Sequence, residues 1–239
     1  MSDALVYALV AAFGNVLGAL AVTRRAALEL RVIEHFLAFG AGFMLSVALV
    51  ELLPEAFARS GSAAPALVLG GYLAVHLTQH TLTPHFHFGE ETHAISPIAG
   101  TSALIGLLLH TFFDGVAIAS AFLVRPELGI MVFIAIFLHK LPEGVTISSI
   151  MMAGGRTRGR AIGAATLLGV ATVIGVFLTD HVAFLVAHGL ALSAGVTIYV
   201  AASNLVPEIQ GKKGWTLPAA FFTGAAVFFV TKMIVDGAS

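Results

Sequence analysis

Apolar segments long enough to cross a membrane occupy almost the whole chain and leave only short connectors between them. Of the 239 residues, 58% are hydrophobic and 10% are charged, whereas a soluble domain carries about 25% charged residues. Because about 20 apolar residues span the hydrocarbon core as a helix, we predict an all-α integral membrane protein with eight transmembrane helices, forming a single polytopic domain over residues 1–239. The expected helices cover residues 4–22, 33–53, 65–82, 98–124, 128–152, 161–178, 182 or 190 to 206, and 215–235.

Two short motifs place ionisable side chains inside these apolar segments. HTFFDG covers residues 110–115 and HKLPEG covers residues 139–144. Each motif has a His four residues before a carboxylate, and residues four apart share one face of a helix. Ionisable groups inside a membrane are costly and by default indicate a functional site.

The two motifs can meet at one depth in the membrane. In an antiparallel hairpin that turns near residues 126–127, His110 lies level with Glu143, and Asp114 lies level with His139. Imidazole and carboxylate groups together suit zinc, iron, manganese or cobalt, and the chain has no Cys that could supply thiolate ligands. The alternative is a buried polar contact without metal, but two matched pairs, each followed by Gly, favour a metal site.

The two hexamers resemble the signature of the fourth and fifth transmembrane helices of the ZIP (Zrt/Irt-like protein) family of divalent metal transporters. The resemblance implies that His110, Asp114, His139 and Glu143 form a transport site. It implies zinc as the most typical substrate, with Fe2+, Mn2+, Co2+ or Cd2+ as further candidates. It also implies an eight-helix fold in which one bundle moves against the other and delivers metal into the cytoplasm.

Lys140 is unexpected inside the second hexamer. Many ZIP proteins have Asn, Asp or Glu at this place, and Asn where this chain has Thr111, and those residues help to hold a second metal. A cation at Lys140 would repel a second metal ion. We therefore predict a single-metal site with Lys140 in the place of a second ion. The alternative is that Lys140 points away from the site towards the membrane surface.

A short internal similarity predicts an inverted repeat. SVALVELLPE, at residues 46–55, aligns without gaps to YVAASNLVPE, at residues 199–208. The two helices are expected to run in opposite directions, so the similarity predicts that helices 1–3 and 6–8 are related by inverted topology around a central hairpin of helices 4 and 5. Such repeats are typical of alternating-access transporters.

Further polar residues are expected near the two mouths of the protein. Glu51 and Glu55 are candidates for an entry mouth that concentrates cations, and Asn204 and Glu208 are candidates for an exit. The alternative for the two glutamates is a solvated helix end. The loop at residues 83–96 contains three further candidates for weak metal contact, although these could also be ordinary loop residues: His85, His87 and His93.

The distribution of basic residues predicts the orientation. Eight of the twelve Lys and Arg residues lie in connectors on one side, which the positive-inside rule assigns to the cytoplasm. Both termini are then outside, and the His-containing loop is cytoplasmic. We expect a multi-pass protein of a cell membrane, and the short loops suit a bacterial inner membrane. Small-residue helix faces are compatible with a homodimer, and no basic block indicates a nucleic-acid partner.

Two other classes of protein can be weighed against a transporter. An intramembrane metal-dependent hydrolase would use the same metal to activate water, but the chain has no H-E-x-x-H motif, and using all four central residues as ligands leaves no evident base. A metal sensor would need a signalling domain, for which the chain has no room. We therefore expect a transporter and no enzyme activity.

Overall fold

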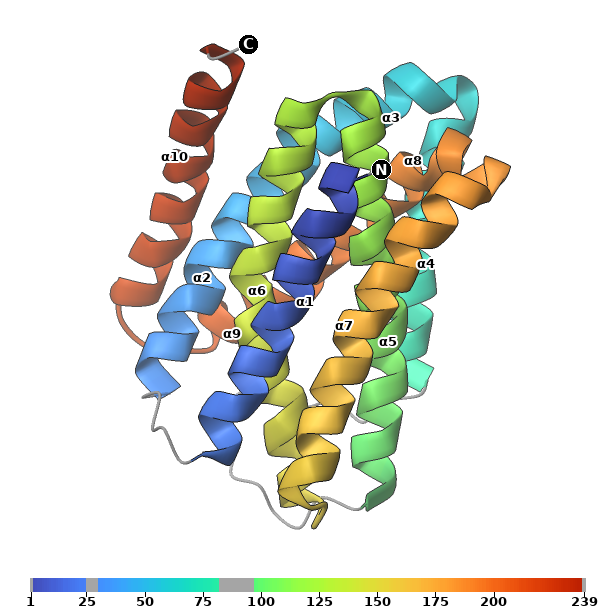
Figure 1. Cartoon of the computed structure of the whole chain (residues 1–239). Coiled ribbons are helices and arrows are strands. Elements are labelled where there is room, and N and C mark those ends of the chain that lie inside the picture. The colour runs from blue at the N-terminus through green and yellow to red at the C-terminus, as the bar shows by residue number, and fades with distance from the viewer. Residues whose placement is uncertain (1, 25–29, 82–96, 238–239) are drawn as a thin grey trace.

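The computed structural model describes residues 2–24, 30–81 and 97–237, and no strand occurs among them. The helices lie side by side and run roughly along one direction (Figure 1). The helices are α1 (Ser2–Thr23), α2 (Leu30–Val47), η1 (Ala48–Leu52), α3 (Leu53–Ser60), η2 (Gly61–Ala63), α4 (Ala64–Thr81), α5 (Pro97–Val124), α6 (Pro126–Ala153), α7 (Arg158–His181), α8 (Ala183–Ile198), η3 (Tyr199–Leu205), α9 (Val206–Gln210) and α10 (Thr216–Gly237).

Seven helical stretches of the described chain are long and apolar enough to cross a membrane. One of them, Arg31–Gln79, contains 49 residues, which exceeds the roughly 20 residues of a single crossing. This stretch runs along α2, through α3, and back along α4, with the change of direction near Gly61 (Figure 1). The first turn of α1 and the last turn of α10 lie towards the same end of the molecule (Figure 1).

The second predicted helix extends beyond its expected end at residue 53. Helical structure continues through η1 and α3 to Ser60. Pro54 does not stop it, because the wider π-helical turn of η1 lies immediately before this proline and accommodates its missing backbone N–H and its ring. A π-helical segment, η1, precedes Pro54, and a second one, η3, precedes Pro207 at the start of α9. Such segments are rare in proteins, and those that occur often lie at functional sites.

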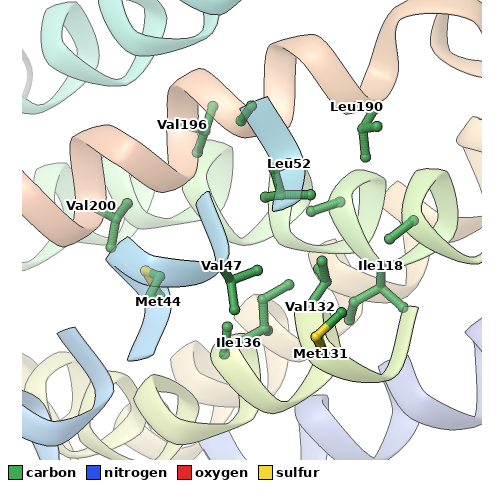
Figure 2. Packing of buried hydrophobic residues seen from close by; sticks show 14 of the residues in the cluster. Met44, Val47, Leu52, Ile118, Met131, Val132, Ile136, Leu190, Val196 and Val200 are labelled. Atoms are coloured by element: carbon green, nitrogen blue, oxygen red, sulfur yellow. The ribbon is translucent and has the colours of Figure 1, made fainter. Parts of the chain in front are cut away.

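The long helices pack as two bundles. Helices α1, α5, α6 and α7 form the first bundle. Two helix pairs, α2 with α10 and α4 with α8, pack beside it and meet each other mainly through η1 and η3; these four helices are called the second bundle. The boundary between them is largely apolar where α2, η1 and α8 face α5 and α6. Figure 2 shows part of this packing, in which Val47 and Leu52 belong to the same buried cluster as Ile136 of α6 and Ile118 of α5.

Close helix crossings occur within each bundle at pairs of facing glycines. Small residues allow helix backbones to approach in this way. A Cβ atom added to any of these eight glycines would lie 1.9–2.2 Å from a backbone carbonyl oxygen of the facing helix. The pairs are Gly18 and Gly144 between α1 and α6, Gly115 and Gly175 between α5 and α7, Gly42 and Gly224 between α2 and α10, and Gly71 and Gly195 between α4 and α8.

Replacing Gly71 with Ala should destabilise the protein, whereas the same change at the preceding glycine should not. A Cβ at Gly71 would lie 2.0 Å from the Leu192 carbonyl oxygen, and one at Gly70 would have no neighbour within 4 Å. Overpacking of this kind costs about 1–3 kcal/mol, while Gly→Ala in an open helix position stabilises by about 0.5–1 kcal/mol. Thermal unfolding in detergent measures the difference, and equal midpoints for both variants would contradict the crossing.

Candidate metal site

The hairpin of α5 and α6 brings four metal-binding side chains together in the interior of the first bundle. His110 and Asp114 come from α5, and His139 and Glu143 come from α6. All four are buried, and one ligand atom from each lies within 4.8 Å of the others. Asp114 Oδ2 lies 3.5 Å from His110 Nε2 and 3.4 Å from His139 Nε2. These are the four residues that the two hexamers predict.

The structure places the four side chains at the same height along the α5–α6 hairpin, as the sequence predicts. His110 Nε2 lies 4.0 Å from Glu143 Oε1, and Asp114 faces His139, as expected for a turn between the end of α5 and Pro126. His110 lies near the middle of α5. At about 1.5 Å per residue it is roughly 20 Å from the start of that helix, a depth that agrees with the position inside the hydrocarbon core expected from the sequence.

Two atoms of the cluster are buried without a hydrogen-bond partner: Glu143 Oε1 and His110 Nδ1. An unpaired buried carboxylate oxygen costs free energy unless a cation satisfies it. Zinc with ligand bonds of about 2.1 Å in a tetrahedral site needs ligand atoms about 3.4 Å apart. Three of the separations are 3.4–4.0 Å, and all four ligand atoms lie within 4.8 Å of one another, so a small inward movement of the side chains would let them bind one small divalent cation.

Lys140 points into the cluster rather than towards the membrane surface. It is fully buried, and its Nζ donates to Asp114 Oδ2 at 2.6 Å and to Glu143 Oε2 at 2.8 Å. With both carboxylates ionised, the ammonium group neutralises one of their two charges. Asp114 Oδ2 therefore faces both the imidazoles and the ammonium group, and an incoming metal would share this oxygen with Lys140 or displace it.

Asn15 approaches the same cluster from α1. With its amide nitrogen facing the acceptors, Asn15 donates to the Lys140 carbonyl oxygen at 2.6 Å and to Glu143 Oε2 at 3.1 Å. The sequence gives a signal for this role, because Asn15 interrupts an apolar helix next to Gly14 and Gly18, and a polar residue there needs a partner on a neighbouring helix. Its particular partner could not be predicted from spacing.

The predicted entry residues lie at the end of the molecule that carries both termini. Glu51, in η1, is buried and forms ion pairs with Arg125 and Lys232. Glu55 is half-buried and lies 3.5 Å from Arg59. The ion pair between Glu51 and Arg125 joins the second bundle to the α5–α6 turn of the first. Arg125 and Lys232 were not singled out in the sequence, because they lie far from Glu51 along the chain.

The predicted exit residues and loop histidines are apart from the central cluster or outside the described part of the chain. Asn204, in η3, donates to Gln79 Oε1 of α4 at 2.8 Å. Glu208 lies in α9, but its side chain is not among those described. His85, His87 and His93 lie outside the described residues.

The fold and site define a helical, multi-pass membrane protein with a buried His–carboxylate cluster. A family model described as ZIP Zinc transporter matches residues 89–232, which is more than half of the chain. The chain therefore belongs to the ZIP zinc transporter family, and the family resemblance of the two hexamers is confirmed. Membership implies divalent metal transport rather than catalysis. A comparison with curated proteins gave no match.

Proposed function

We propose that this protein transports a divalent metal ion, with zinc preferred, and that His110, Asp114, His139 and Glu143 bind the ion during transport. The observation that carries the proposal is the burial of these four side chains at one level of the α5–α6 hairpin. Mixed imidazole and carboxylate ligands hold a metal less tightly than thiolates, and their affinity depends on protonation. Such a site can both bind an ion and release it. The same ligand chemistry also suits Fe2+, Mn2+ or Co2+, and we include Cd2+ among the alternative substrates.

A single bound ion is the stoichiometry that the charges favour. Lys140 Nζ lies between the carboxylates of Asp114 and Glu143, where a second cation would otherwise find negative charge. A second divalent ion in this space would be close to the ammonium group and repelled by it. Lys140 thus acts as an internal cation in place of a second metal.

The proposed topology has eight crossings with an inverted repeat around α5 and α6. In this topology α2 and α4 cross the membrane separately. Three observations support the repeat. First, η1 and η3 lie within the aligned segments 46–55 and 199–208. Second, the offset in residue number that aligns the two segments also relates Gly42 to Gly195 and Gly71 to Gly224, and all four of these glycines lie at close helix crossings. Third, the repeat would relate α1 to α7 and α6 to α5, and α1 packs closely on α6 just as α7 packs closely on α5.

The proposed mechanism is alternating access by movement of one bundle against the other. The close glycine crossings join helices of the same bundle, whereas apolar side chains fill much of the boundary between bundles. Apolar contacts are not directional, so this boundary suits sliding better than the crossings do. The ion pair between Glu51 and Arg125 would hold the bundles together at the entry end. We place both termini outside and the direction of transport inward, in a cell membrane of bacterial type.

Zinc entry into liposomes tests the proposal. The purified chain is reconstituted into vesicles that contain a zinc-sensitive dye, and external zinc is varied. We expect entry that saturates with zinc concentration and exceeds entry into protein-free vesicles. Zinc binding without any entry would contradict transport and would turn attention to an intramembrane metal-dependent hydrolase.

A further inference from the structure

We propose that Asn15 restricts Glu143 to a single metal-binding oxygen and thereby favours four-coordinate zinc over ions that need more ligands. Asn15 is a positioning residue in this proposal, since it acts on the metal only through Glu143. The inference rests on the proposed function, because it assigns selectivity to the same central site.

The two oxygens of Glu143 have different surroundings. Oε2 accepts from the Asn15 amide at 3.1 Å and from Lys140 Nζ at 2.8 Å. Oε1 is buried without a partner and lies 4.0 Å from His110 Nε2. The carboxylate is therefore held by one oxygen and presents the other to the imidazole, which is the arrangement of a ligand that binds through one oxygen.

The position of Asn15 is fixed by the close crossing of α1 and α6. Asn15 is fully buried. A Cβ atom at Gly144 would lie 2.0 Å from the Asn15 carbonyl oxygen, and one at Gly18 would lie 2.2 Å from the Leu141 carbonyl oxygen. The backbones are therefore in contact on both sides of Glu143. The second bond from Asn15, to the Lys140 carbonyl oxygen at 2.6 Å, anchors the amide to the backbone of α6.

This restraint has a consequence for metal choice. With one oxygen from each carboxylate and two imidazoles, the site offers four ligands, which is the number that zinc commonly takes in proteins. Manganese favours octahedral, oxygen-rich sites. Without Asn15, Oε2 would be held only by Lys140 Nζ, which a bound cation repels. Oε2 could then turn to the metal as a fifth donor, and this would favour manganese relative to zinc. Residues that orient metal ligands typically change affinity by about 10–100-fold when they are replaced.

The test compares wild type with Asn15→Ala and Asn15→Ser in the purified full-length chain. The serine side chain is one bond shorter than that of asparagine. It fills more of the site than alanine does, but its hydroxyl should not reach Glu143 Oε2. Zn2+ and Mn2+ affinities are measured by competition with a chelating dye, and the visible spectrum is recorded after loading with Co2+. Thr23→Ala is the matched control, because Thr23 is also a buried polar residue of α1 but bonds only its own helix, through the Ala19 carbonyl oxygen at 2.8 Å.

We expect the preference for Zn2+ over Mn2+ to fall about tenfold in either variant that folds. The intense absorption of four-coordinate Co2+ should weaken at the same time, and Thr23→Ala should leave both properties unchanged. An equal loss of affinity for both metals, with an unchanged Co2+ spectrum, would show a merely structural role and overturn the inference. If wild type bound none of the three metals, the proposed central site would fail as well, so the two failures are distinguishable.

Discussion

Replacing Asp114 with Asn should abolish zinc transport and weaken zinc binding by about 100-fold or more. Asp114 Oδ2 lies 3.5 Å from His110 Nε2 and 3.4 Å from His139 Nε2, and it also accepts from Lys140. Asparagine keeps the shape of the side chain but lacks its charge. Loss of a residue that only orients a metal ligand lowers metal affinity by up to about 100-fold. Loss of a charged ligand should lower the affinity at least as much, which corresponds to about 3 kcal/mol of binding free energy. Zinc titration and dye-loaded liposomes measure the two effects.

A matched control is the same substitution at Asp180, a carboxylate near the end of α7 and outside the cluster. Asp180→Asn should keep zinc affinity and entry close to wild-type values. Retention of saturable zinc entry in Asp114→Asn, with wild-type affinity, would show that the ion takes another route. Loss of activity in both variants would point to a general effect of charge removal instead of a specific ligand.

Replacing Lys140 with Met should destabilise the metal-free protein by about 3–5 kcal/mol, because removal of one partner leaves a buried charge uncompensated. Lys140 is fully buried and bonds one oxygen each of Asp114 and Glu143. Zinc should restore much of the loss, since an ion that binds only the folded state adds about 2.7 kcal/mol at 100 times its dissociation constant. Thermal unfolding with and without zinc measures both changes.

The exposed Lys213 provides the control for Lys140. Lys213→Met should change stability by no more than about 0.5 kcal/mol, and zinc should stabilise it as it does wild type. A Lys140→Met variant as stable as wild type without metal would contradict the role of Lys140 as an internal cation. Stoichiometry gives a second check, since Lys140→Asn should bind one additional metal ion if Lys140 stands in the place of a second one.

Much of the central cluster could be predicted from the sequence because local rules determine it. A spacing of four residues sets the face of a helix, and a short turn sets the level of two antiparallel helices. Those two rules bring His110 to Glu143 and Asp114 to His139, and the structure agrees. The helical, membrane-spanning character follows from apolar length in the same way.

Contacts between distant helices could not be predicted in this way. Asn15 meets Glu143, and Glu51 meets Arg125 and Lys232, only because of how whole helices pack. The π-helical turns were also missed, since one extra residue shifts the hydrophobic pattern by only about 100°, and this shift cannot be seen in helices that are apolar on most faces. The continuation of the helix past Pro54 depends on the π-helical turn immediately before it, so it was missed for the same reason.

Transport through the central cluster requires that its four side chains bind one metal ion. X-ray absorption at the zinc edge, on the full-length protein loaded with one equivalent of zinc, tests it most directly. We predict four nitrogen or oxygen neighbours at about 2.0–2.1 Å, with the outer-shell scattering of two imidazoles, and loss of this signal in His110→Ala combined with Glu143→Ala. The same spectrum in the double variant would contradict the account, because the zinc would then be bound elsewhere.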